Sequence, residues 1–159
     1  MKIDLSKAKT SAQAVTTVCY NESTRNLDYR IKCEDFKDLK ACISIIHGYN
    51  QFNHTTINKA LDTYFGLRKY YGEDNGNNGN DLFEFEIGRE GSPAMYVSLW
   101  TYKFGANDKI RVYTNDVNVE EYKTSEFDLA AKAFQHDAIA DECNTVGGTG
   151  QMTYRFWWD

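Results

Sequence analysis

Two segments, LFEFEI (residues 82–87) and MYVSLWTYKF (residues 95–104), decide the fold class of this chain. In each segment two sets of side chains alternate from one residue to the next, which is the pattern of a β-strand. Short turns around these and the later strands favour antiparallel neighbours. The alternating sets are Phe83, Phe85 and Ile87 against Glu84 and Glu86 in the first segment, and Tyr96, Trp100, Tyr102 and Phe104 against Met95, Val97 and Leu99 in the second.

The remaining pattern predicts an α+β fold in a single domain, residues 1–159, with an antiparallel β-sheet and about three helices packed mainly on one face. Helices are indicated by apolar residues at helical spacing, as for Phe36, Leu39, Ile43 and Ile46. We expect helices over residues 34–47, 56–71 and 125–143; further strands over 15–20, 27–33, 109–114, 117–122 and 151–159; a flexible loop over 73–81; and a flexible link over 145–150.

Composition excludes disorder and a membrane-spanning segment. Hydrophobic residues make up 42% of the chain and aromatic residues 14%, which is enough for a substantial core. The longest apolar runs fall far short of the roughly 20 residues that a spanning helix needs. Asp4 interrupts the place where a signal peptide would have its apolar stretch. We therefore expect a cytoplasmic protein, in the host cell if phage-encoded.

The formal charge is divided unequally along the chain. Residues 1–72 carry 11 Lys and Arg against 7 Asp and Glu, whereas residues 73–159 carry 7 against 16. The balances are +4 and −9, in agreement with the net charge of −5. The second half therefore repels nucleic acid and attracts cationic surfaces.

Three patterns resemble chemical sites without meeting their requirements. The loop at residues 74–81 lacks two calcium ligands of the EF-hand frame. The glycines of residues 146–150 lack the following helix that a phosphate cradle needs. Glu84 and Glu86 alternate with apolar residues, so they are the solvent face of a strand rather than a catalytic carboxylate pair.

The four cysteines are Cys19, Cys33, Cys42 and Cys143, and none forms a CxxC pair. The series Cys42, His47 and His54 lacks the tight ligand pairs of structural zinc. We therefore predict buried thiols, no metal, no cofactor and no catalytic residues.

The aromatic strands suggest a docking surface. Exposed Tyr, Trp and Arg are frequent interface hot spots, and helices on one side of a sheet leave some aromatic residues on the other. Aromatic residues on a sheet can also stack on single-stranded bases, but that needs a basic groove, and the flanking strands are acidic. Direct nucleic-acid binding through the acidic half is therefore disfavoured.

These observations favour a non-enzymatic binding protein that docks on a basic, nucleic-acid-handling surface of a protein partner. Glu126, Asp137 and Asp141 share one side of an ideal helical wheel and form a phosphate-like row in the expected last helix. Asp137 and Asp141 would be an i,i+4 pair of like charge. The predicted partner-binding residues are Glu84, Glu86, Trp100, Tyr102, Glu120, Glu121, Glu126, Asp137, Asp141, Trp157 and Trp158.

In general character, a small, acidic chain rich in Asn and Tyr is similar to the host-defence inhibitors of bacteriophages, including anti-CRISPR proteins. This resemblance implies an inhibitor. It rests on size, charge and composition and not on a sequence motif. Two alternatives stay open: a small enzyme or ligand-binding domain with a pocket between sheet and helices, and a self-associating structural protein of a phage or mobile element. No membrane partner is expected, and a homodimer is compatible with the pattern.

Overall fold

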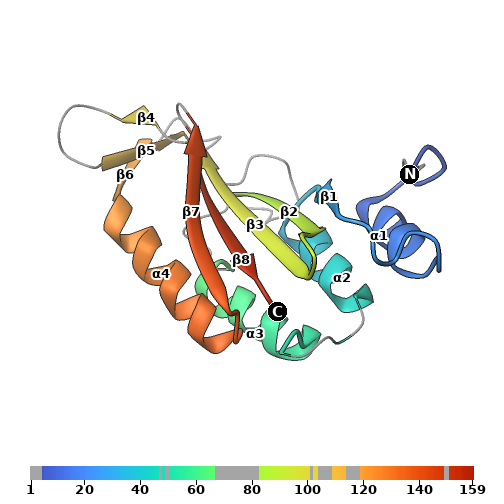
Figure 1. Cartoon of the computed structure of the whole chain (residues 1–159). Helices are drawn as coiled ribbons and strands as arrows, with labels where there is room; N and C mark the ends of the chain where they lie inside the picture. The colour runs from blue at the N-terminus through green and yellow to red at the C-terminus, as the bar shows by residue number, and fades with distance from the viewer. Residues whose placement is uncertain are drawn as a thin grey trace.

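The main layer of the computed structural model is a five-stranded antiparallel sheet with strand order β1-β2-β3-β8-β7 (Figure 1). Its strands are β1 (Tyr29–Lys32), β2 (Phe83–Arg89), β3 (Pro93–Trp100), β7 (Glu142–Gly148) and β8 (Gln151–Trp157). A three-stranded sheet consists of β4 (Tyr102–Lys103), β5 (Lys109–Tyr113) and β6 (Val119–Lys123). The helices are α1 (Ser11–Cys19), α2 (Phe36–Ile45), α3 (His54–Tyr64) and α4 (Thr124–Asp137).

The structure describes residues 5–46, 48, 51–66, 83–100, 102–103, 109–113, 119–148 and 151–159. For residues 100, 102–103, 109–113, 119–124, 147–148 and 151 it describes the backbone but not the side chain. The loop predicted at residues 73–81, with its calcium-like pattern, lies outside the described residues.

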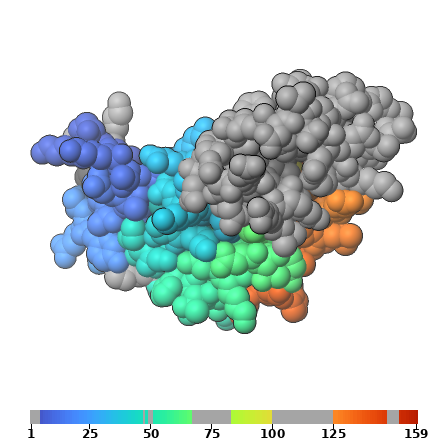
Figure 2. All heavy atoms as spheres, turned by 180° about the vertical axis from the view of Figure 1, so that it is seen from behind, coloured from blue at the N-terminus to red at the C-terminus, as the bar shows by residue number. Residues whose placement is uncertain are grey.

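The core lies between one face of the large sheet and the helices, which cover the rear of the sheet in Figure 1 and the near side in Figure 2. Phe65, just after α3, stands at its centre. Its ring centroid lies 5.4 Å from those of Phe83 and Phe134 and 6.3 Å from that of Phe156. The side chain of Phe65, which follows α3, therefore contacts residues of β2, β8 and α4. Helices thus pack on an antiparallel sheet, and the predicted α+β class is confirmed.

The prediction of a strand over residues 15–20 is wrong, because these residues belong to α1. Thr16 and Thr17 favour strands, but their hydroxyls donate to the carbonyls of Ala12 and Gln13, 2.8 Å away in each case, and fit the helix. Thr10 caps the N-terminus by accepting from the backbone N–H of Gln13. The buried residues Ser11, Ala14, Val15 and Val18 have helical spacing, so the described residues contain four helices where about three were predicted.

Helix α4 also ends earlier than the predicted 125–143. The backbone N–H of Ala140 donates to Gln135 O at 3.0 Å, and that of Ile139 donates to His136 O at 3.3 Å. Ile139 has φ +56°, so these bonds form a Schellman motif with isoleucine at the left-handed position. The chain then enters β7. Residues 145–148 belong to this strand, so the prediction of a flexible link over residues 145–150 is wrong for these four residues.

The second predicted helix, 56–71, is likewise too long, because α3 ends at Tyr64. The helix begins two residues before the predicted start, where Asn53 caps it by accepting from the backbone N–H of Thr56 at 3.1 Å. Phe65 then turns into the core, and its side chain is fully buried.

Candidate functional site

The sheet face opposite the helices, called here the open face, carries alternating charged and aromatic side chains. Register places Lys32, Glu86, Tyr96 and Arg155 on one row across four strands. Tyr96 is almost completely buried even on this face, because the guanidinium of Arg30 lies 3.9 Å from the centre of its ring. This aromatic side chain is therefore covered by a neighbouring residue of the sheet.

The acidic residues of β2 lie on this face as predicted, but each is paired with a cation of β1. Arg30 contacts the Glu86 carboxylate through Nε at 2.7 Å and Nη2 at 3.0 Å. Lys32 Nζ lies 3.6 Å from Glu84 Oε1. These pairs reduce the negative charge that Glu84 and Glu86 could present to a partner.

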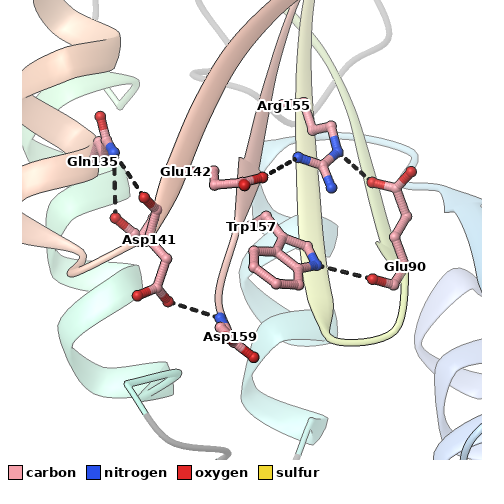
Figure 3. A network of polar contacts seen from close by, with 8 residues as sticks. Glu90, Gln135, Asp141, Glu142, Arg155, Trp157 and Asp159 are labelled. Carbon is pink, nitrogen blue, oxygen red and sulfur yellow. Dashed lines mark hydrogen bonds and ion pairs between the residues drawn. The ribbon is translucent and has the colours of Figure 1, made fainter.

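Arg155 on β8 joins two further acidic residues on the open face (Figure 3). Its guanidinium contacts the carboxylates of Glu90 and of Glu142, the latter at 3.1 Å, and its side chain is only 18% exposed. Burial acts to raise the pKa of Glu90, but hydrogen bonds from Arg155 and Tyr96 outweigh it and lower the pKa. Burial and the hydrogen bond to Glu90 raise the pKa of Tyr96 to about 12.

The two tryptophans of the C-terminal strand have different environments. Trp157 is half-buried on the open face and donates its Nε1–H to Glu90 O at 2.9 Å. Trp158 is fully buried: it packs edge to face on Phe52 and donates to Ala138 O at 3.0 Å. The prediction that Trp158 is a docking residue is therefore wrong, because strand alternation turns it into the core.

The outward face of α4, called here the α4 face, is a second candidate surface. At 100° per residue, Glu126, Ala130, Ala133 and Asp137 lie within about 60° of one another, with Leu129 beside them. Glu126 and Asp137 are exposed, and Leu129 is 69% exposed. Leu129 thus lies to one side of the two acidic residues, with Glu126 on one flank and the exposed Lys132 on the other, on a helix whose opposite face is buried in the core.

The predicted i,i+4 pair of Asp137 and Asp141 does not exist, because α4 ends at Asp137. Asp137 accepts from Tyr64 Oη of α3 and contacts His136 Nδ1 at 3.0 Å, and these contacts lower its pKa. Asp141 instead accepts from the backbone N–H of Asp159 at 2.7 Å (Figure 3). The two carboxylates are therefore held by different partners on either side of the helix end.

Four predicted docking residues have no described side chain. Trp100 lies at the end of β3, Tyr102 on β4, and Glu120 and Glu121 on β6. Their strands are antiparallel as predicted. The docking role of these four residues stays a prediction.

Sequence reasoning missed Glu90, Glu142, Arg155 and Leu129 as contributors to these surfaces. Arg155 had a usable signal, since it alternates with Tyr154 and Phe156 and so must lie on the other face of β8. Glu90 and Glu142 had none, because their pairing with Arg155 depends on the order of strands in the sheet.

A shallow groove of about 360 Å³ runs between α3 and the end of α4. Thr55, Thr56, Lys59, Ala60, Thr63 and Asp137 line it. Its charged residues are Lys59 and Asp137, and Asp137 is already engaged by Tyr64 and His136. The groove lies between two helices, whereas the alternative of a ligand-binding domain placed its pocket between sheet and helices, so that alternative stays a prediction.

One set of side chains has the composition of a metal site. The sulfur atoms of Cys33 and Cys42 and a carboxylate oxygen of Asp38 all lie within 4.8 Å of one another. Both cysteines are buried and free, whereas Cys19 and Cys143 are only partly buried. A hydrogen bond with Cys42 is the largest cause that raises the pKa of Cys33, and burial is the second.

Comparison with models of known protein families, with curated proteins and with solved structures finds no match. Within the described part of the chain, no helix is both long and apolar enough to cross a membrane.

Proposed function

We propose that the protein is a non-enzymatic binding protein whose α4 face docks on a basic surface of a protein partner. The observation that carries the proposal is the exposed Leu129 beside the exposed acidic residues Glu126 and Asp137. On the open face, by contrast, Glu84, Glu86 and Glu90 are each paired with a cation. Among the described side chains, this contrast supports α4 over the acidic residues of β2 as the docking element.

The position of α4 in the fold supports this choice. Helix α1 packs on the edge strand β1 and α4 on the opposite edge strand β7, so the first and the last helix lie at opposite sides of the sheet (Figure 1). Residues 5–66 contain eight Lys and Arg against six Asp and Glu, whereas residues 124–159 contain two against six. The segment that contains α4 is thus more acidic than the segment that contains α1, a difference that favours the approach of a basic surface toward α4.

The composition of the α4 face matches the usual anatomy of an interface. Interfaces combine an apolar centre, which supplies most of the affinity, with a polar rim that supplies selectivity. Leu129 would supply the apolar contact, and Glu126 and Asp137, which lie to one side of it, the polar contacts. Basic surfaces in cells mostly handle nucleic acid, so a chain docked in this way would act as an inhibitor by occluding such a surface.

The test is capture of the partner from a nuclease-treated host lysate, followed by competition with duplex DNA. We expect a stoichiometric protein that binds at low salt, is released near 0.5 M salt and is displaced by DNA, because DNA and the α4 face compete for one basic surface.

Charge reversal identifies the surface used. Glu126→Lys with Asp137→Lys should abolish capture, and Glu22→Lys with Glu34→Lys is the matched control. Glu22 and Glu34 are also exposed, but they lie near α1 and α2. A partner that DNA does not displace, or that both double variants capture equally, would contradict the proposal.

A further inference from the structure

Cys33, Asp38 and Cys42 lie where β1 leads into α2, on the other side of the molecule from the α4 face. Cys33 is the residue after β1, and its backbone N–H donates to Phe85 O at 2.9 Å, so it is fixed to the sheet. Asp38 and Cys42 are one helical turn apart on α2, at the i,i+4 spacing that places both side chains on one side. Three potential ligands from two rigid elements therefore converge.

The separations are close to those of a tetrahedral thiolate site. Zinc lies about 2.3 Å from sulfur and about 2.0–2.2 Å from a carboxylate oxygen, so tetrahedral ligands lie roughly 3.5–3.8 Å apart. Here Cys42 Sγ lies 4.0 Å from Asp38 Oδ1, and no pair in the group exceeds 4.8 Å. An inward movement of about 1 Å or less, within reach of side-chain rotation, would close the site.

Asp38 is already oriented toward the two sulfur atoms. Its Oδ2 accepts from the backbone N–H of Glu34 at 2.8 Å, and its own backbone N–H donates to the Asp35 cap at 2.7 Å. Among the described residues, Oδ1 meets only the weak thiol donor of Cys42. A carboxylate that is fixed through one oxygen and directs the other at two thiols is the arrangement found where an outer hydrogen bond orients a metal ligand.

We propose that Cys33, Asp38 and Cys42 bind one thiophilic divalent cation of the Zn²⁺ type. On binding, both thiols release their protons to solvent and two sulfur–metal bonds form. Asp38 supplies the third ligand, and because it is only half-buried, water can take the fourth position. The cation would fasten α2 to the end of β1. The sequence predicted no metal here, and this proposal is independent of the one made for the α4 face.

The test is titration of the reduced, metal-free full-length protein with Co²⁺, whose absorption reports thiolate ligands and tetrahedral geometry. We expect one Co²⁺ per chain, with a sulfur-to-cobalt charge-transfer band, and displacement by Zn²⁺. Cys33→Ala and Cys42→Ala should each lower the affinity by more than about 100-fold, since the loss of an outer partner alone costs 10–100-fold. Cys143→Ala, which removes a half-buried thiol on β7, should leave binding unchanged.

Asp38→Asn keeps the proposal testable if a cysteine variant does not fold. This variant should fold, since the amide oxygen of Asn can still accept from the backbone N–H of Glu34. We expect Co²⁺ to bind at least about tenfold more weakly to this variant, with the charge-transfer band retained because both thiolates remain. Absence of stoichiometric binding by the wild type would overturn the proposal. So would wild-type affinity in Cys33→Ala or in Asp38→Asn.

Discussion

At the scale of single residues, Ile139 has the least favourable backbone conformation among the described residues. Its φ of +56° falls in the left-handed region, which β-branched side chains rarely adopt and which costs about 1–2 kcal/mol for an L-residue. The Schellman bonds of Ile139 and Ala140 to the last turn of α4 offset this cost. The side chain is 49% exposed, so burial compensates for only part of it.

Ile139→Gly should therefore stabilise the protein although it removes apolar surface. We expect a rise in melting temperature of about 2 °C, since glycine adopts positive φ without the steric cost. Ile139→Ala is the control, because alanine loses the same side chain but keeps the strained Cβ. Thermal unfolding should place the glycine variant about 1 kcal/mol above the alanine variant. Equal stability of the two would show that the backbone at this position is not strained.

The two adjacent tryptophans give a second test at the residue scale. Trp158→Ala should cost about 3–5 kcal/mol, because it leaves a cavity beside Phe52 and Phe134. Trp157→Ala should cost about 1 kcal/mol, since its ring is half-exposed and loses one hydrogen bond. Urea unfolding of both variants measures the difference. A larger loss for Trp157 would reverse the assigned faces of β8.

At the scale of elements, the contacts of Arg155 join the β2–β3 turn to the edge strand β7 through two carboxylates (Figure 3). The lowered pKa of Glu90 means that the folded protein favours the ionised carboxylate. Its contribution to stability is therefore present above the usual carboxyl pKa of about 4.3 and is lost as the pH falls through the lower, folded-state pKa. Because Glu90 is partly exposed, this contribution is below about 1 kcal/mol.

Glu90→Gln should be less stable than the wild type at pH 7, and the difference should shrink as the pH falls from about 5 to 3. Urea unfolding at several pH values measures it. Glu22→Gln, an exposed residue far from Arg155, is the control and should show no such trend. A difference that stays constant with pH would mean that Glu90 acts through packing and not through its charge.

The differences between prediction and structure have identifiable physical causes. Alternation in residues 82–87 was sufficient to place β2, because one face of this strand is buried and the other partly exposed. In residues 95–104 it indicated a strand, but β3 is buried on both faces and ends at Trp100, and residues 102–103 form β4 in the other sheet. In α1 the β-branched residues suggested a strand, while the helical spacing of Ala14, Val15 and Val18 and the Thr10 cap were the better signal. The end of α4 gave no such signal, since isoleucine at the left-handed position resembles a continuing helix.

At the scale of the whole molecule, residues 5–66 carry more cationic than acidic side chains and residues 124–159 the reverse, and the helices α1 and α4 of these segments pack on opposite edge strands. The sequence predicted the acidic character of the second half and the acidic residues of α4. It could not predict which acidic residues are paired, because Arg30, Lys32 and Arg155 reach their partners across strands that are distant in sequence. Among the described side chains, the docking proposal therefore rests on the α4 face, while the docking role of Trp100, Tyr102, Glu120 and Glu121 stays a prediction.

The most direct test of this account is the association rate between the protein and its captured partner, measured at 50 mM and 0.5 M salt. For Glu126→Lys with Asp137→Lys we predict at least a tenfold slower association at low salt than for wild type, and rates within about twofold at high salt, where charges are screened. The Glu22→Lys with Glu34→Lys control should associate at nearly the wild-type rate at low salt. Equal low-salt association rates for wild type and the α4 variant would contradict the central claim.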